Sequence, residues 1–195
     1  KELQRIVAIP RRDHLDLESK KALALVEIMT ARLTKKDVVL CSCVSCIKTL
    51  KPAQALALYE APLAKGLLAP IGVGHGKTGI DILMPMVFKD CKLALLFVPP
   101  QLMKQLFRAY QEWSVHFDTP SIVCGTEGCI KKGKPSLHVI PFSIFSRHES
   151  TDLLEQLRPD LIIVDEAHNF RHKDTSRTAR LLRYLAKYQE TRLCV

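Results

Sequence analysis

The stretch Ile71-Gly72-Val73-Gly74-His75-Gly76-Lys77-Thr78 decides how this chain folds. It lies between a short apolar segment, residues 67–71, and a second apolar segment that begins near Lys77. A glycine-rich loop between a strand and a helix can wrap a polyphosphate, because its backbone N–H groups converge on the phosphate oxygens. The strict eight-residue pattern starts with glycine, whereas Ile71 stands at that place here, and the alternative is a tight turn without a ligand.

The chemistry of the loop residues favours a phosphate-binding loop over a simple turn. Lys77 is expected to reach the β- and γ-phosphates of a bound ATP, and the Thr78 hydroxyl is expected to bind Mg²⁺. His75 either touches phosphate or metal or points into solvent. The predicted nucleotide-contacting residues of the loop are Gly72, Gly74, His75, Gly76, Lys77 and Thr78.

A second polar cluster follows an apolar run later in the chain. The residues Leu161-Ile162-Ile163-Val164 have the composition of a buried strand, and Asp165-Glu166-Ala167-His168 follows them directly. In open α/β folds, ligands bind at the carboxyl ends of such strands. Asp165 is therefore suited to hold Mg²⁺ and Glu166 to deprotonate an attacking water, although both could instead cap a helix. Together the two motifs predict an ATP-hydrolysis site.

Predicted strands and helices alternate from residue 67 onward. Strands are expected at 67–71, 93–98, 121–123, 137–140 and 161–164, and helices at 15–33, 52–65, 101–117, 176–189 and from Lys77 to a kink or end at Pro85. We therefore predict a three-layer α/β/α domain of the P-loop NTPase type, with a mostly parallel sheet, over residues 49–195. Residues 1–48 are predicted to form a small extension that contains a helix and cysteines.

The composition indicates an intracellular protein with a polyanionic partner. The 195 residues carry a net charge of +9, which favours nucleic acid over a plain solubility charge. No apolar run is long enough to span a bilayer, and no signal peptide opens the chain. Seven cysteines, an odd number, argue against a disulfide framework, so a reducing compartment such as the cytoplasm is expected. The first residue, Lys1, and the strand-like composition at the end suggest a fragment of a longer protein.

With both motifs in place, the chain resembles the first RecA-like domain of superfamily-2 helicases and translocases. Residues 165–168 match the DEAH form of the family's second motif, and residues 71–78 are similar to its first motif. The resemblance runs from about Leu50 to Val195, where the family's third motif would begin. It implies that Lys77, Asp165, Glu166 and His168 carry catalysis with ATP and Mg²⁺, and that His168 links the ATP site to the third motif.

Within that superfamily, the Swi/Snf-type double-stranded DNA translocases look most similar. The segment Leu50-Lys51-Pro52-Ala53-Gln54 is similar to the one that precedes their first motif, which implies that Gln54 reads the adenine edge. Ala53 replaces the usual aromatic residue there. Residues 97–102 and 141–146 are similar to the family's motifs Ia and Ib, and residues 169–176 to the run that follows its DEAH box. The nucleic-acid contacts implied or expected are Pro100, Lys104, Ser143, Ser146, Arg147, Arg171 and Lys173.

The resemblance implies an ATP-dependent DNA helicase or translocase with a second RecA-like domain that supplies an arginine. The chain alone is then expected to bind nucleotide and to hydrolyse it poorly. The alternatives are an RNA helicase of the same superfamily, a kinase with a phosphate loop, or a non-enzymatic module that binds nucleotide and nucleic acid. Two basic clusters, the helix at 176–189 and Lys131-Lys132-Lys134, either contact phosphates or are solvated surface.

Three closely spaced thiols, Cys41, Cys43 and Cys46, suggest a zinc site. A fourth ligand would come from His14, from one of the two cysteines of the loop Cys124–Cys129, or from sequence upstream of the chain. The alternative is that the thiols pack as small apolar groups, since no second Cys-x-x-Cys is present.

Overall fold

The chain folds around a six-stranded sheet with the order β3-β2-β4-β1-β5-β6. The computed structural model describes residues 19–36, 46–72, 74–125, 127–129, 131–172 and 174–195. Five strands are parallel, and the edge strand β3 pairs antiparallel with β2. The strands are β1 (Leu93–Val98), β2 (Ser121–Cys124), β3 (Glu127–Cys129), β4 (Ser136–Pro141), β5 (Leu161–Val164) and β6 (Arg192–Cys194).

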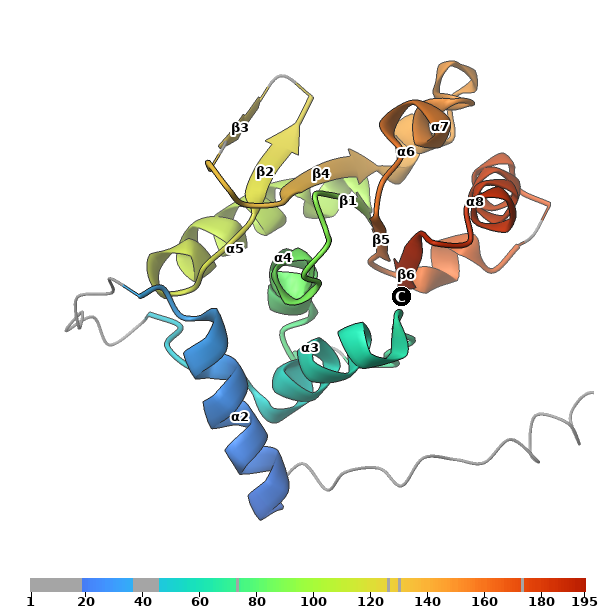
Figure 1. Ribbon diagram of the computed structural model, residues 1–195. Coiled ribbons are helices and arrows are strands. Elements are labelled where there is room, and N and C mark those ends of the chain that lie inside the picture. The colour runs from blue at the N-terminus through green and yellow to red at the C-terminus, as the bar shows by residue number, and fades with distance from the viewer. Residues whose placement is uncertain (1–18, 37–45, 73, 126, 130, 173) are drawn as a thin grey trace, which may run out of the picture.

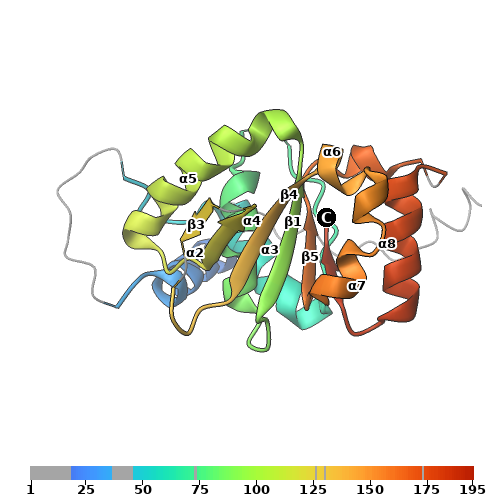
Figure 2. The same cartoon turned by 90° about the horizontal axis from the view of Figure 1, so that it is seen from above.

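Helices cover both faces of the sheet, as Figures 1 and 2 show. One face carries α2 (Lys20–Leu33), α3 (Pro52–Ala64), α4 (Lys77–Val87) and α5 (Met103–His116), and the other carries α6 (Phe142–Phe145), α7 (Leu153–Leu157) and α8 (Ser176–Lys187). Short 3-10 turns lie at Pro100–Leu102, His148–Ser150 and Ala167–Phe170. The predicted three-layer α/β fold with a mostly parallel sheet is therefore confirmed, and it is consistent with a RecA-like domain.

The apolar run of β1 is explained by this arrangement. Alternate side chains of a strand point to opposite faces. Leu96 and Val98 belong to the core under α4 and α5, whereas Leu95 and Phe97 belong to the core under α6 and α8. All four are buried, and the same division holds within β5. A strand covered on both faces needs apolar residues at every position.

The strand predicted at residues 67–71 is only an extended segment beside β6. Leu67 forms an isolated parallel bridge with Cys194. The Leu67 backbone N–H donates to the Leu193 carbonyl at 3.0 Å, and the Val195 N–H donates to the Leu67 carbonyl at 2.8 Å. The segment runs parallel to β6. The phosphate loop therefore begins at the carboxyl ends of the parallel strands, where Asp165 also lies, and β6 separates the two.

Other elements differ from the prediction in detail. Pro85 does not end α4, which continues to Val87. The strand β3 and the helices α6 and α7 fall in segments for which no regular structure was predicted. The helix α2 begins at Lys20, capped by the Ser19 hydroxyl, and buries Met29 and Leu33 in the core that α3 and α4 share. Within the described residues, no helix combines the length and the apolar composition needed to cross a bilayer.

Candidate functional site

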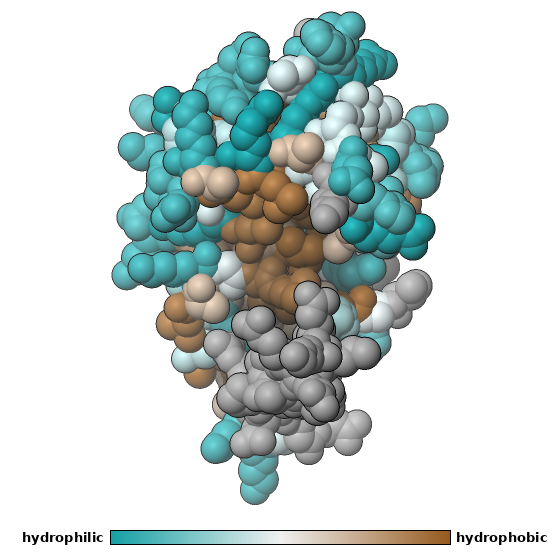
Figure 3. Space-filling model, turned by 90° about the vertical axis from the view of Figure 1, so that its right-hand side faces the viewer, coloured by the Kyte–Doolittle hydropathy of each residue, from teal (hydrophilic) through white to brown (hydrophobic). Residues whose placement is uncertain are grey.

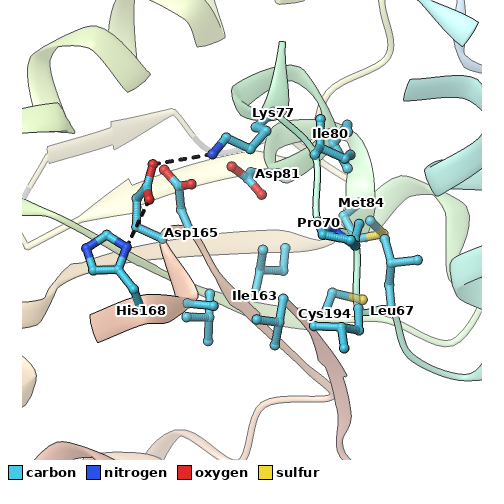
Figure 4. Close-up of a pocket in the computed structure, with 17 residues that line it drawn as sticks. Leu67, Pro70, Lys77, Ile80, Asp81, Met84, Ile163, Asp165, His168 and Cys194 are labelled. Carbon is cyan, nitrogen blue, oxygen red and sulfur yellow. Dashed lines mark hydrogen bonds and ion pairs between the residues drawn. The ribbon is translucent and has the colours of Figure 1, made fainter. Parts of the chain in front are cut away.

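A cavity of about 300 Å³ opens where the phosphate loop, the start of α4 and the ends of β5 and β6 meet. Figure 4 shows that its two ends differ in chemistry. The polar end carries Lys77, Asp81, Asp165, Glu166 and His168, and the other end is lined by Leu67, Pro70, Ile80, Met84, Ile163 and Cys194. On the side of the molecule that carries α8 and the C-terminal residue, Figure 3 shows a band of apolar side chains between hydrophilic margins.

The phosphate loop is held in place by the beginning of α3. Gly76, which precedes α4, has φ 76° and ψ 41°, a left-handed conformation that favours glycine. Its carbonyl accepts a hydrogen bond of 2.8 Å from Nε2 of Gln54, and a Cβ atom at this position would overlap the same nitrogen. The Gly74 carbonyl accepts a hydrogen bond of 2.9 Å from Nζ of Lys51. Lys51 and Gln54 both belong to the segment 50–54 that was expected to precede the phosphate loop.

Gln54 is buried, and its amide group already has protein partners. Oε1 accepts a hydrogen bond of 2.8 Å from the Lys51 backbone N–H, and Nε2 is the donor to Gly76. The side chain thus links the first turn of α3 to the loop. Its contact with adenine stays a prediction. The remaining loop residues that were predicted, Gly72, Gly74 and His75, are exposed.

The acidic residues follow β5 through a sharp turn of the backbone. The Asp165 N–H donates to the Phe97 carbonyl at 3.0 Å, so Asp165 still continues the sheet. Glu166 has φ 61° and ψ 63°, a left-handed conformation that costs about 1–3 kcal/mol for a residue other than glycine. Asn169 stabilises the turn, because its backbone N–H and its Nδ2 donate to the Glu166 carbonyl at 3.0 and 3.1 Å. Such strained residues cluster at functional sites.

The Glu166 carboxylate lies between the Lys77 ammonium and the His168 ring. Nζ of Lys77 is 3.3 Å from Oε1, and Nδ1 of His168 is 3.2 Å from Oε2. Figure 4 shows both contacts at the polar end of the cavity. The fold therefore brings together Lys77, Asp165, Glu166 and His168, the four residues predicted to carry catalysis. Thr78 follows Lys77 in the first turn of α4 and is half-buried, but it is not part of the cavity wall.

Negative charge exceeds positive charge at this end of the cavity. Burial raises the pKa of Asp81 well above its ordinary value, and the neighbouring Asp165 raises this pKa further. Burial also raises the pKa of Asp165, with an additional contribution from Glu166. Lys77 opposes both shifts, and no other cation of the described residues does so. A further cation would stabilise the ionised carboxylates.

The donor set fits magnesium that arrives with a nucleotide. Carboxylate and hydroxyl oxygens are the ligands that Mg²⁺ prefers, and it commonly takes only one or two carboxylates plus phosphate oxygens and waters. In the part of the chain that the structure describes, no three His, Cys, Asp or Glu side chains are grouped so as to hold a metal ion by themselves. Asp165 and Thr78 would thus supply part of a coordination shell that phosphates complete.

A second cleft, of about 620 Å³, shares Glu166 and His168 with the first cavity. Three of the predicted nucleic-acid residues, Pro100, Ser143 and Ser146, line it. Its remaining lining residues are Pro99, Gln101, Leu102, Phe142, Asn169 and Arg177. Arg177 lies with its guanidinium carbon 5.9 Å from the centre of the Phe142 ring. Arg177 belongs to the helix at 176–189, one of the two basic clusters predicted either to contact phosphates or to be solvated.

Three other predicted nucleic-acid residues, Lys104, Arg147 and Arg171, are not brought into this cleft. All three are exposed outside it, and Lys173 lies outside the described residues. The Arg147 carbonyl accepts a hydrogen bond of 2.6 Å from Arg180, which also donates to the Phe145 carbonyl at 2.7 Å. Arg180 of the basic helix therefore bridges α8 to the end of α6.

The lysine cluster contacts neighbouring side chains, and most of the predicted zinc ligands lie outside the described residues. Lys134 forms an ion pair with Asp118, and Lys131 lies over the Tyr110 ring with Nζ 5.0 Å from its centre. Cys41, Cys43 and His14 lie outside the described residues, and Cys46 is half-buried. Among the residues that the structure describes, no three metal-ligating side chains are grouped, and the predicted zinc site falls mostly outside these residues.

Comparisons with known proteins show a loose structural likeness to a helicase. No protein-family model matches the chain, and no curated protein matches it. Among solved structures, the chain is similar to the DEAH/RHA helicase HrpB of Escherichia coli, with 17% sequence identity and a TM-score of 0.49. The match covers 72% of this chain and 19% of that helicase, so the chain spans about a fifth of its length. Because the identity and the TM-score are both low, this likeness carries no functional argument.

Proposed function

We propose that the chain is the nucleotide-binding domain of a superfamily-2 helicase or translocase and holds Mg-ATP in the 300 Å³ cavity. The observation that carries this proposal is the contact between Lys77 and Glu166 at 3.3 Å, which unites the phosphate loop with the acidic motif. Lysine, threonine and two carboxylates at a strand edge form the set that phosphate-loop ATPases use.

Lys77 and the loop bind the phosphates. The N–H groups at the start of α4 and the Lys77 ammonium would attract the β- and γ-phosphates. The negative phosphates would then replace the Glu166 carboxylate as the ion-pair partner of Lys77. Magnesium, held by Thr78 and Asp165, would neutralise charge on the phosphate oxygens. Gln54, buried against Gly76, fixes the loop.

Glu166 would act as the general base. Release from Lys77 leaves the Glu166 carboxylate free to orient a water and to accept its proton, while His168 holds the second carboxylate oxygen at 3.2 Å. In the family that the motifs resemble, an arginine from a second RecA-like domain stabilises the transition state. The chain by itself should therefore bind nucleotide and hydrolyse it slowly.

Nucleic acid would bind in the second cleft, which shares Glu166 and His168 with the nucleotide cavity. Serine hydroxyls and the Arg177 guanidinium are suited to phosphate oxygens rather than to base edges. Double-stranded DNA is the proposed track, because residues 97–102 and 169–176 are similar to Swi/Snf-type motifs. The net charge of +9 favours the same class of partner.

Measurement of nucleotide binding and of ATP turnover with different polymers tests this function. The chain should bind a fluorescent ATP analogue, and duplex DNA should raise phosphate release more than single-stranded DNA or RNA does. Stimulation by RNA alone would favour the RNA helicase, and phosphate transfer to a small molecule without nucleic acid would favour the kinase. A chain that does not bind nucleotide would refute all the enzyme functions.

A further inference from the structure

Asp81 is a third carboxylate at the polar end of the cavity. It lies on α4 four residues after Lys77, so both side chains project from the same face of the helix. Figure 4 shows its carboxylate directed toward that of Asp165, next to the Lys77 side chain. The phosphate-loop and DEAH motifs do not include this position, and Asp81 was not among the predicted site residues.

Neither helix formation nor packing explains an aspartate at this place. Asp81 is inside α4, beyond the first turn, where a carboxylate neither caps the helix nor favours it. Its neighbours Ile80 and Ile82 are buried apolar residues. In the described part of the chain, the Asp81 side chain has no hydrogen bond, and the ion pair of Lys77 goes to Glu166 instead.

The surroundings of Asp81 favour a cation. The charged groups that act on Asp81 are Asp165, Lys77 and Glu166, and two of them have the same charge as Asp81. The Asp81 carboxylate faces that of Asp165 (Figure 4), while the adjacent Lys77 is paired with Glu166, so among the described residues the ionised Asp81 has no ion pair, and a carboxylate without a partner is costly. An apolar or small residue would avoid this cost, so the carboxylate is better explained by a charge that arrives with the ligand.

We propose that Asp81 is a magnesium-positioning residue that, together with Asp165, holds the water shell of the Mg²⁺ bound with ATP. This inference rests on the proposed function. Without metal, the two carboxylates repel the triphosphate, and with metal they attract the complex. The pair therefore makes nucleotide binding more dependent on Mg²⁺ than a single aspartate would.

Titration of the chain with a fluorescent ATP analogue, in excess Mg²⁺ and in EDTA, tests the assignment. The quantity of interest is the dissociation constant in EDTA divided by the dissociation constant in excess Mg²⁺. In the Asp81→Asn variant the ratio should fall by about tenfold, because outer-shell carboxylates contribute about 10–100-fold to metal affinity. Asp90→Asn is the matched control, since Asp90 lies beyond the other end of α4 with 87% of its side chain exposed. Its ratio should equal that of the wild type.

A purely structural role would shift both dissociation constants together and leave their ratio unchanged, which would overturn the assignment. Asp81→Ser provides a second neutral variant if Asp81→Asn does not fold, as judged by circular dichroism. Binding of Mn²⁺ in the presence of ATP, measured by electron paramagnetic resonance, should weaken in both variants. A wild-type chain that binds no nucleotide even with Mg²⁺ would refute the proposed function and this inference together. Normal wild-type binding with an unchanged ratio in the variants would refute only the inference.

Discussion

The Nζ atom of Lys77 lies 3.3 Å from Oε1 of Glu166, although 89 residues separate them in the sequence. Lys77 is the first residue of α4, and Glu166 is the second residue after β5. They meet because residues 67–69 pair with β6 and β6 pairs with β5, all in the parallel sense. The contact connects two sequence motifs that were each ambiguous alone.

Replacement of Lys77 by alanine should weaken ATP binding by about 10–100-fold, because a charge-assisted hydrogen bond to phosphate contributes about 1.5–3 kcal/mol. Isothermal titration calorimetry with a non-hydrolysable analogue measures the change. Lys89→Ala is the control, since Lys89 is exposed just beyond the other end of α4. Equal affinities for both variants would contradict the role of Lys77.

Replacement of Glu166 by glutamine should lower ATP turnover by about 100-fold or more, because loss of a general base costs about 10²–10⁴ in rate. Binding of nucleotide should persist, since Lys77 and the loop remain. Phosphate release in the presence of duplex DNA measures the rate. Glu149→Gln, a change at an exposed position outside both cavities, should leave turnover intact. Unchanged turnover in Glu166→Gln would exclude this residue as the base.

The nucleotide-free chain should lose stability as the pH rises above the ordinary carboxyl range. In the folded chain the pKa values of Asp81 and Asp165 are raised above 3.8, mainly by burial. The folded chain therefore binds more protons than the unfolded chain above that pH, and the free energy of unfolding decreases through this window. The stabilisation that the two protonated carboxyl groups provide is fully present below about pH 3.8 and is lost as the pH passes the raised pKa values.

The Asp81→Asn variant isolates this effect. Because it removes one of the two titrating groups, its melting temperature should rise relative to wild type as the pH increases from about 4 to about 8 in metal-free buffer. The expected gain at the upper end is a few degrees. A difference between variant and wild type that stays constant with pH would show that Asp81 is already ionised without strain.

Replacement of Arg177 by alanine should weaken binding of duplex DNA without regard to sequence. The slope of log affinity against log salt concentration should decrease by about one, as expected for the loss of one phosphate contact. Fluorescence anisotropy at several salt concentrations gives the slope. Arg183→Ala provides the comparison, because Arg183 is exposed on the same helix but outside the cleft. If the salt slope decreases only in the Arg183 variant, the DNA lies along the exposed face of α8 and not in the cleft.

The parts of the fold that could be predicted are those with a local cause. The apolar run of β1 indicated a strand covered on both faces, and Gly76 with Lys77 indicated a loop that starts a helix. Of the two effects predicted for Pro85, a kink or an end, the end was wrong, because α4 continues to Val87 and buries Leu83, Met84 and Val87. Packing there outweighs the local preference of proline.

The site was predictable only where a motif marks it. Lys77, Asp165 and Glu166 belong to such motifs, and the structure brings them together. Asp81 belongs to none, and its only local signal was its spacing of four residues from Lys77 within an apolar helix. The second cleft could not be derived, because it forms only when Pro100, Ser143 and Arg177 are brought together from three separate segments.

The most direct test of the central claim is a crystal structure of this chain with Mg²⁺ and a non-hydrolysable ATP analogue. The β- and γ-phosphates should lie against the loop at residues 72–78, with Lys77 moved from Glu166 onto the phosphates and Mg²⁺ beside Asp165. Nucleotide bound elsewhere, or a Lys77–Glu166 contact that persists unchanged beside bound triphosphate, would contradict the account.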